Sequence, residues 1–247
     1  MISVVIPTLQ KNIVVLENLL KSLINDKNVG EIIVVDNSLL NISLKNEKIK
    51  VIIPDENIFV NPSWNLGVKE SKYNLIALLN DDIIIPDDFC SLVANKITPD
   101  MGIVGMSSEC VQEHFELNKI PLKSENLSLI KAKYRCPAFG VAMFFFKNSY
   151  NVIPQDIKIY YGDDWIFLNA QKKHKINYCI TNQVIYHLGS LSSGATELNV
   201  ICKNDKRIFR EKYYKWYDYL FSIEYKGDGY KVRVLGLSFI IKGLNNE

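Results

Sequence analysis

Apolar runs and amphipathic segments alternate along the first hundred residues. The runs are short, rich in Ile, Val and Leu, and stopped by Pro, Asp or Asn, which is typical of strands buried on both faces. They occupy residues 2–6, 31–35, 50–53 and 75–79. Leucines recur at helical spacing over residues 16–24, and Asn61-Pro62 predicts the N-cap and first turn of a helix that ends near residue 71. This alternation predicts an α/β fold whose mostly parallel sheet is flanked by helices.

The pattern is less regular after residue 100. Apolar runs predict strands and one amphipathic stretch predicts a helix, the strands at 101–106, 140–147 and 183–187 and the helix at 163–173. The mostly polar stretch 107–132 predicts a long loop, which is a common place for functional residues. We therefore predict one domain over residues 1–196, with no internal repeat.

The last fifty residues have a different composition. A basic and aromatic segment predicts a helix over 197–221, and alternating residues over 230–242 predict a hairpin around Gly236. Residues 197–247 are thus expected to form a C-terminal extension of helix and hairpin.

Composition narrows the function classes. The chain has 247 residues and a formal net charge of only +2, so charge gives no support for a nucleic-acid partner. Its five cysteines include no C-x-x-C pair, which favours reduced thiols in a cytoplasmic protein. The N-terminus lacks the pattern of a signal peptide, and the longest apolar run, 141–146, is too short to span a bilayer. The sequence sets no oligomeric state.

Carboxylates follow two of the predicted strands. Asp36 comes after the second strand, and Asp81-Asp82 comes after the fourth. The carboxyl ends of parallel strands share one edge of the sheet, where ligands bind. Adjacent carboxylates repel unless a cation or solvent separates them, and Mg²⁺ or Mn²⁺ typically takes one or two carboxylates plus substrate phosphates. The alternative for the Asn80-Asp81-Asp82 triplet is a solvated turn.

Several short motifs stand in a fixed order along the chain. They are residues 4–8, 33–38, an asparagine series at Asn57, Asn61 and Asn65 followed by Gly67, residues 79–82, and residues 162–165. In this order and spacing, the chain resembles the inverting glycosyltransferases of the family 2 type over about residues 1–190. The resemblance implies the GT-A, Rossmann-like fold, with residues 1–100 binding the nucleotide-sugar and residues 101–196 facing the acceptor.

The resemblance also implies roles on the donor side. Pro7, Thr8 and Asp36 match positions that hold the base and ribose, and Asn65 belongs to the same donor-binding set. In the family's D-x-D motif, which here reads Asn80-x-Asp82, the first position contacts the ribose or diphosphate. Asn80 and the neighbouring Asp81 are therefore expected to bind the nucleotide-sugar.

A divalent metal ion, Mn²⁺ or Mg²⁺, is the cofactor that the resemblance implies. Asp82 matches the last aspartate of the D-x-D motif, which is the direct ligand. A histidine near the end of the catalytic core often completes the site, and His187 is the candidate. The alternative for His187 is a hydrogen-bonded structural residue after an apolar strand.

The acceptor side of the resemblance centres on Asp163 and Asp164. Asp163 takes the position of the catalytic base, and Asp164 holds the acceptor or supports the base. Gly162 stands where the family usually has a glutamate, which leaves the register open by one residue. The alternative is an acidic N-terminus of an ordinary helix.

The implied reaction is transfer of a sugar from a nucleoside-diphosphate donor to a glycan hydroxyl, as in synthesis of surface polysaccharide or lipooligosaccharide. UDP is the default nucleotide, and a dTDP-rhamnose-type rhamnosyltransferase is the alternative. A non-catalytic nucleotide-sugar or glycan-binding module also stays open. A pyrophosphorylase is disfavoured because residues 8–12 contain no glycine, and a receiver domain because the first strand ends in Pro7-Thr8 rather than an acidic pair.

Two segments have expectations of their own. Residues 190–194 are small and polar, which suits a loop that closes over the donor. Basic and aromatic residues are interleaved over 203–217, and we expect the aromatic stripe to pack on the core. Peripheral contact with the inner face of a membrane, which would suit a lipid-linked glycan acceptor, is the alternative.

Overall fold

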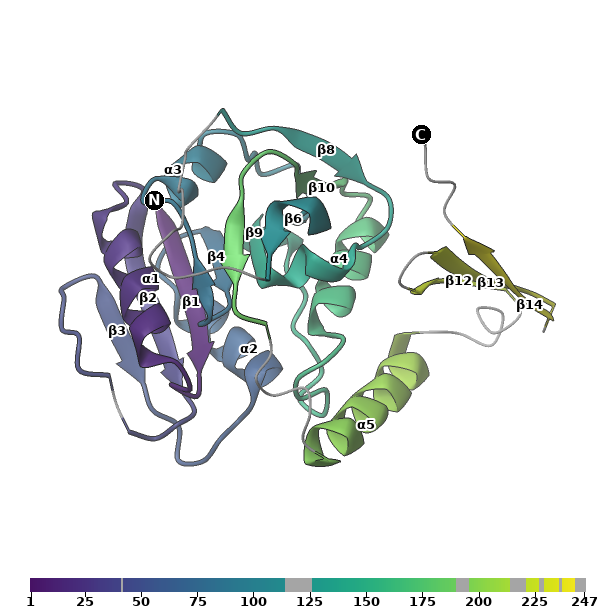
Figure 1. The fold of residues 1–247 in the computed structure, drawn as a ribbon, viewed down its shortest axis with the longest axis horizontal. Helices are drawn as coiled ribbons and strands as arrows, with labels where there is room; N and C mark the ends of the chain where they lie inside the picture. Colours follow the sequence, from purple (N-terminus) through teal and green to yellow (C-terminus); the bar gives the residue numbers. More distant parts are fainter. Residues whose placement is uncertain are drawn as a thin grey trace.

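The computed structural model describes residues 1–40, 42–113, 126–189, 196–213, 221–226, 229–235 and 237–242. The predicted loop at 190–194 and the end of the basic-aromatic stretch, 214–217, lie outside these ranges. Figure 1 shows a large central sheet with helices on both sides and a separate small sheet at the C-terminus. The helices are α1 (Ile13–Asn25), α2 (Val60–Glu70), α3 (Phe89–Ala94), α4 (Gly162–Lys172) and α5 (Thr196–Tyr213).

The central sheet is mixed. Its strands, in spatial order, are β3 (Ile49–Ile52), β2 (Val29–Asp36), β1 (Ile2–Thr8), β4 (Leu75–Leu79), β9 (Ala142–Phe146), β6 (Val104–Met106), β10 (Asn177–Ile180) and β8 (Leu129–Ala132). The first four are parallel, whereas β9 runs antiparallel between β4 and β6. The predicted α/β fold with a mostly parallel sheet is therefore confirmed.

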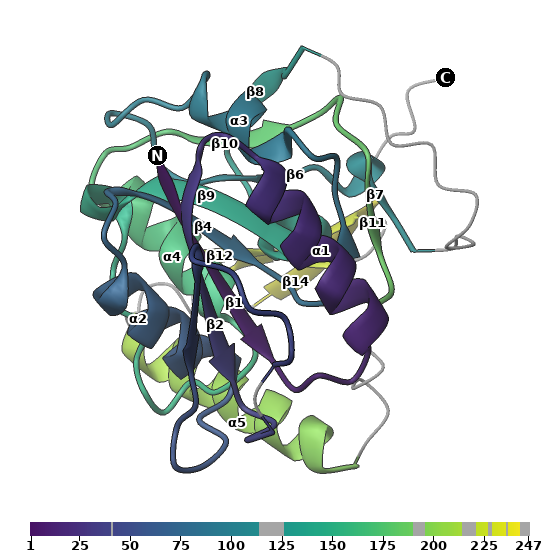
Figure 2. The ribbon, with the colours of Figure 1, turned by 90° about the vertical axis from the view of Figure 1, so that its left-hand side faces the viewer.

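Alternate side chains along the strands contribute to two apolar layers, one on each face of the sheet. On β1, Val4 and Ile6 face the layer that contains α1 and α3, while Val5 faces the layer that contains α2, α4 and α5. All three side chains are fully buried. Figure 2 shows α1 on one side of the sheet and α2, α4 and α5 on the other. Because both faces are covered, the loops at the carboxyl ends of the strands are the natural place for polar chemistry.

A second sheet of three short strands joins distant parts of the chain. It contains β5 (Ile83–Ile84), β11 (Ile185–His187) and β7 (Val111–Gln112). β11 pairs antiparallel with β5 and parallel with β7. The described ends of the predicted long loop at 107–132 thus belong to sheets, as β7 and β8, and single 3₁₀ turns lie at Ser108–Cys110, Pro137–Val141 and Lys147–Ser149.

One predicted helix start needs correction, and one strand was not predicted. The helix expected to be capped by Asn61 begins at Val60 instead, because the Asn61 backbone N–H and side-chain amide donate to the carbonyls of Lys158 and Tyr160. β10 was not predicted, because it is short and starts at the polar residue Asn177. This buried amide accepts from the Ile103 N–H and donates to the Phe167 carbonyl, so a polar residue occupies a core position with its hydrogen bonds satisfied.

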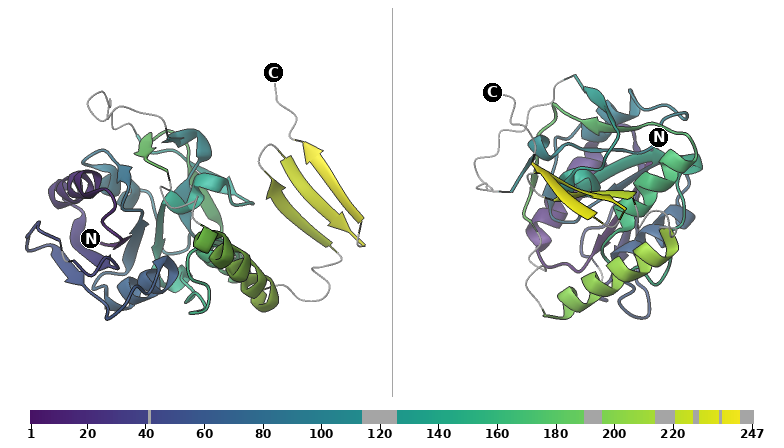
Figure 3. Two further views of the ribbon diagram at one scale, coloured as in Figure 1. Left: turned by 60° about the horizontal axis from the view of Figure 1, so that its bottom comes forward. Right: turned by 90° about the vertical axis from the view of Figure 1, so that its right-hand side faces the viewer.

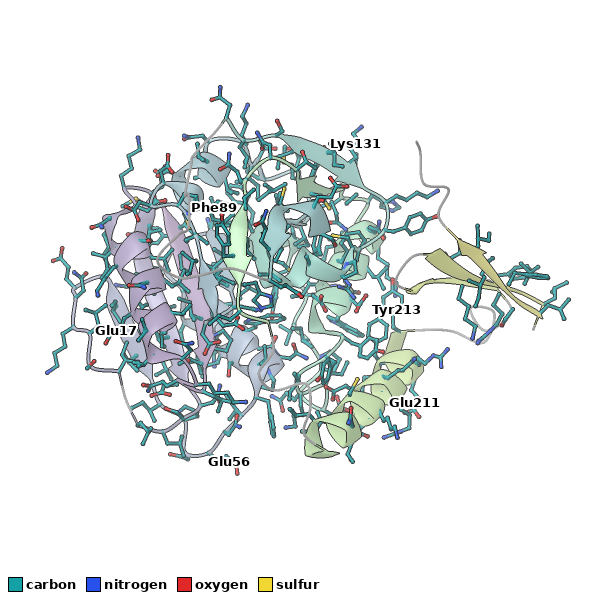
Figure 4. The ribbon with its side chains drawn as sticks, in the orientation of Figure 1. Glu17, Glu56, Phe89, Lys131, Glu211 and Tyr213 are labelled. Carbon is teal, nitrogen blue, oxygen red and sulfur yellow. The ribbon has the colours of Figure 1, made fainter. Side chains whose placement is uncertain are left out.

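The C-terminal helix packs on the domain. Ile208 and Phe209 of α5 are buried, and Phe209 stacks on Tyr161 at a centroid distance of 5.2 Å. Figure 4 shows Tyr213 on the side of α5 facing α4, where it lies edge-on to Trp165, and Glu211 on the outer side. The described part of the aromatic stripe therefore packs on the core, as expected. Among the residues described, no helix is both long and apolar enough to cross a membrane.

Three antiparallel strands follow α5. They are β12 (Phe221–Lys226), β13 (Gly229–Val234) and β14 (Leu237–Lys242). β13 and β14 form the predicted hairpin. β12 was not predicted, and the helix predicted to reach residue 221 is wrong at its end, because α5 ends at Tyr213 and Phe221 begins β12. Figure 3 shows this small sheet standing apart from the domain.

Candidate active site

A pocket of about 240 Å³ opens at the carboxyl edge of the parallel strands. β1 contributes Pro7 and Thr8, the turn after β2 contributes Asn37, and the end of β4 contributes the 80–82 triplet. The rest of the lining comes from residues Leu9, Lys11, Asn12, Asn57, Phe59, Val60, Ile159 and His187. Of the predicted donor and metal residues, the structure thus brings Pro7, Thr8, Asn80, Asp81, Asp82 and His187 together.

Within the triplet, Asp81 ties β4 to β1. Its Oδ2 accepts a hydrogen bond of 2.6 Å from Thr8 Oγ1. Burial raises the pKa of Asp81, while the Thr8 hydroxyl counteracts part of this shift and the charge of Asp82 adds to it. A neutral hydroxyl therefore stabilises this carboxylate and fixes the loop after β1 against the end of β4.

Asp82 has a different partner. Its Oδ1 lies 3.1 Å from His187 Nε2, and the Asn80 amide nitrogen lies 3.3 Å from the same ring nitrogen. The pairing of the second sheet explains this meeting: His187 pairs with Ile83, and the Leu188 N–H donates to the Asp82 carbonyl. Burial lowers the pKa of His187, but the hydrogen bond and charge of Asp82 outweigh it and leave the pKa raised.

The donor set suits a divalent cation that arrives with a phosphate ligand. Asp82 Oδ1 and His187 Nε2 lie together, whereas no group of three or more His, Cys, Asp and Glu side chains within the described ranges is placed to hold a metal ion. The protein thus offers two ligands and leaves the other coordination positions open. This matches Mg²⁺ or Mn²⁺, which commonly takes one or two protein ligands and completes its shell with water and substrate phosphate.

Two predicted donor contacts lie elsewhere. Asp36 is fully buried behind the pocket, where it accepts from the Ser38 N–H and from Gln10 Nε2, and the neighbouring Asn37 lines the pocket instead. Asn65 faces away from the pocket. Its Oδ1 accepts from Tyr150 Oη at 2.6 Å and its Nδ2 donates to the Ile153 carbonyl. The Asn65 amide is thus saturated by the 150–153 segment, and the structure gives it a packing role.

The predicted catalytic pair lies in the first turn of α4. Arg135 joins the two carboxylates, with Nη1 at 2.9 Å from Asp163 Oδ2 and Nε at 2.7 Å from Asp164 Oδ1. Burial and the charge of Asp163 raise the pKa of Asp164 to about 6, against the lowering by Arg135. Burial works against the charge of Arg135, but the two carboxylates outweigh it and raise its pKa. No sequence signal singled out this arginine.

The acidic pair and the triplet are connected through one short segment. The Asn80 N–H donates to the Val141 carbonyl, and the preceding residue, Gly140, lies directly against Asp163. A Cβ on Gly140 would lie 2.6 Å from Asp163 Oδ2, so only glycine allows this approach. The end of β4 and the start of α4 therefore face one another across residues 140–141.

Gly162 explains the departure from the family pattern. A Cβ at this position would lie 2.0 Å from Asn61 Oδ1, so the glutamate usual at this place in the family has no room. Asn61 in turn is held by the 158–160 segment. α4 starts close against α2, which leaves Asp163 and Asp164 as the acids of this turn.

Sequence reasoning missed two further contributors. Lys11 is an exposed cation in the pocket lining, on the loop after β1. Asp205 of α5 is fully buried and accepts from the backbone N–H groups of residues 158, 159 and 160. Because Ile159 lines the pocket, α5 fixes part of its wall. A lone Asp in a basic helix gave no signal of this role.

Comparison with known proteins identifies the family. The model of the family described as Glycosyl transferase family 2 matches residues 3–170. The chain belongs to this family. The match spans most of the pocket lining, the end of β4 with Asn80, and the start of α4, so the family 2 glycosyltransferase pattern covers every predicted site residue except His187. None of the curated proteins matches the chain.

Solved structures share the fold at low sequence identity. Against S. aureus TarS, the family 2 chain has a TM-score of 0.52 and 14% identity over 90% of its own length and 46% of the other. Against the mannosyltransferase PcManGT from Pyrobaculum calidifontis in complex with GDP-Man and Mn²⁺, the TM-score is 0.55 and the identity 11%, over 85% of this chain and 63% of the other. Against GalNAc-T7 with UDP, GalNAc and Mn²⁺, the TM-score is 0.60 and the identity 10%, over 89% of this chain and 49% of the other. The chain spans less than two thirds of each of these proteins.

Proposed function

We propose that this family 2 glycosyltransferase is an inverting, metal-dependent enzyme that moves a hexose from a nucleoside-diphosphate donor to a hydroxyl of a glycan. The observation that carries the proposal is the contact of Asp82 with His187 in the pocket, whose β4 end is linked through residues 140–141 to the Arg135-bound acidic pair. One group supplies ligands for a cation and the other supplies a base.

The donor half of the reaction rests on the pocket. Asp82 and His187 would hold Mn²⁺ or Mg²⁺, which supplies Lewis-acid neutralisation of the leaving diphosphate when bound. Pro7 and Thr8 would contact the base and ribose, and Lys11 adds a positive charge at the pocket for the diphosphate. Two of the similar structures contain a nucleotide or nucleotide-sugar with Mn²⁺, which supports this assignment.

The acceptor half rests on α4. Asp163 takes the proton of the acceptor hydroxyl as the oxygen attacks the anomeric carbon, and the bond to the diphosphate breaks on the opposite side, which inverts the configuration. Asp164 and Arg135 hold this carboxylate in place. The attacking hydroxyl oxygen must be aligned with the leaving group. The first turn of α4 contacts the end of β4 through residues 140–141, which gives Asp163 a rigid support.

The substrates follow from the same proposal. UDP is the nucleotide we expect first, and dTDP, with a rhamnosyl donor, second. The acceptor we propose is a glycan or lipid-linked glycan of a surface polysaccharide or lipooligosaccharide, reached by a cytoplasmic enzyme. A non-catalytic binding module is the competing function. It would tolerate loss of Asp163, whereas the enzyme loses turnover and keeps donor binding.

A thermal-shift panel tests the proposal directly. The full chain is heated with UDP, GDP or dTDP, with and without Mn²⁺, and we expect one nucleotide to raise the melting temperature only when Mn²⁺ is present. Asp82→Ala should abolish this shift. The matched control is Asp87→Ala, an exposed acid five positions along the chain, which should keep it. No shift with any nucleotide would sink the proposal.

A further inference from the structure

The C-terminal sheet has one apolar face. Residues directly opposite one another in an antiparallel register project to the same side. Phe221 pairs with Val234, which pairs with Leu237, and this forms one apolar row across the three strands. A second row follows the same register, because Ile223 pairs with Val232.

Phe239 completes the second row and Ile241 extends the face along β14. The side chains on this face are large and open to solvent: Phe239 is 53% exposed and Ile241 56% exposed, and Phe221 and Ile223 on β12 are 55% and 49% exposed. The described residues of this face include no charge. We call these two rows with Ile241 the apolar face.

The opposite face is polar. Lys231 and Arg233 of β13 and Ser238 of β14 alternate with the residues of the apolar face. Ile240 is the apolar exception there, and it is 69% exposed. Apart from Ile240, the described residues alternate between the two faces, which indicates that the sheet is built to cover one side, since a one-residue shift in register would exchange the faces.

Nothing in the described part of the chain covers the apolar face. The three strands pack extensively only against each other, and Figure 3 shows the sheet away from the central domain. A three-stranded sheet needs a hydrophobic face packed on something to be stable in water. A contiguous exposed apolar patch of this kind marks an interaction site.

We propose that a second copy of this chain covers the apolar face, so that two C-terminal sheets pack face to face into a six-stranded sandwich. Half-exposed Phe, Leu and Ile side chains offer roughly 100 Å² each. The five such side chains of the apolar face then contribute about 500 Å² per copy, and two copies bury about 1,000 Å², which is the threshold for a specific protein interface.

Shape and charge favour a second copy over a lipid surface. Phe221 and Phe239 stand on the edge strands beside the smaller Val232 and Val234 of the central strand, so the large side chains of one copy can fill the trough above the valines of the other. Lys231 and Arg233 lie on the far side, where a sandwich leaves them in solvent. On a membrane the same cations would point away from anionic headgroups, and the attraction would be screened over about 10 Å.

The proposal is independent of donor and acceptor, and the oligomeric state of the full chain tests it. Light scattering after size exclusion should give twice the chain mass at concentrations above about 10 µM. Phe239→Glu should give the monomer mass, and Ile241→Glu, at the margin of the face, should weaken the dimer at least tenfold. The matched control is Ile240→Glu on the opposite face, which should stay dimeric. Circular dichroism of each variant checks that the domain stays folded.

Three outcomes would overturn the proposal. One is a wild-type monomer at every concentration. Another is a dimer that Ile240→Glu breaks and Phe239→Glu does not. The third is a monomer that co-sediments with vesicles of anionic phospholipid and loses this binding in Phe239→Glu, which would make the apolar face a membrane contact.

Discussion

Asp81 and Asp82 follow β4, whereas Asp163 and Asp164 open α4, and the two acidic pairs differ in what balances their charge. Arg135 bridges both carboxylates of the second pair. In the first pair, Asp81 has the neutral Thr8 hydroxyl and Asp82 has His187. The protein itself thus supplies the second pair with a permanent cation, which offsets one of its two negative charges, while the first pair has no Lys or Arg partner among the described contacts.

This difference separates the two jobs of the proposed reaction. A metal site must leave coordination positions open, which a permanent guanidinium would block. A general base must be held in one orientation, which the guanidinium 2.9 Å from Asp163 promotes. The two acidic pairs therefore differ in the side chains that contact them: a guanidinium at the second pair, and a hydroxyl and an imidazole at the first.

The largest expected effect follows from removing the proposed base. Asp163→Asn should lower kcat by about 10²–10⁴-fold, because the acceptor hydroxyl no longer has a proton acceptor. Donor affinity, measured by calorimetry with the nucleotide and Mn²⁺, should stay within about twofold. Asp100→Asn, an exposed acid outside the site, is the control. Unchanged turnover in Asp163→Asn would favour a role for Asp164 as base.

Removing the bridging cation should have the next largest effect. Arg135→Met leaves two carboxylates without their partner, which we expect to cost about 3 kcal/mol of unfolding free energy in urea. Because Arg135 lowers the pKa of Asp164, its loss should raise that pKa above about 6 and move the acid limb of the pH–rate profile to higher pH. Lys131→Met, on the exposed side of β8, should change neither quantity (Figure 4).

The same raised pKa sets a pH dependence of stability. The folded-state pKa of Asp164, about 6, lies above its ordinary value of 3.8, so the folded state binds more protons between these values. Stability should therefore fall as pH rises from about 4 to 6, and Asp164→Asn should remove this part of the slope. Denaturant midpoints measured across this range check the sign.

A smaller effect is expected at the first pair. Thr8→Val removes the hydroxyl that donates to Asp81, and loss of this hydrogen bond to a partly buried carboxylate should cost about 1–2 kcal/mol of stability. The loss of unfolding free energy caused by Thr8→Val should be smaller in an Asp81→Asn background, because residue 81 then carries no charge. A double-mutant cycle in urea measures this coupling. Additive effects would show that the hydrogen bond contributes little.

The smallest effect concerns the pocket cation. Lys11→Ala should weaken nucleotide-diphosphate affinity about three- to tenfold, with a weaker effect at high salt, because Lys11 is exposed and screened. Lys21→Ala, exposed on α1, is the control. Equal loss in both variants would point to general surface charge.

The sequence predicts the donor half of the fold better than the acceptor half. Residues 75–79 were placed to the residue, because a buried parallel strand has a continuous apolar run with clear stops. β10 was not predicted, because the hydrogen-bond partners that allow Asn177 to be buried, Ile103 and Phe167, are not its neighbours in sequence. The triplet was visible for the same reason as β4, whereas Arg135 and Asp205 act through contacts that the fold alone creates.

Site predictions show the same division. Thr8 and Asp81 follow predicted strands whose carboxyl ends must share an edge, so their meeting could be foreseen. The contact with His187 depends on the pairing of β5 with β11, and two- and three-residue strands have too little pattern to predict. Asn65 was misplaced because a motif position does not specify which side of α2 the amide faces.

The tight packing of Gly162 on Asn61 has a consequence for sequence change. Residue 162 cannot gain a side chain while Asn61 stays in place, because a Cβ there collides with the Asn61 amide. Introducing glutamate at 162 would require shortening residue 61 at the same step. The two positions are thus coupled, and a lineage that passes between the two arrangements must cross through a pair of compensating substitutions.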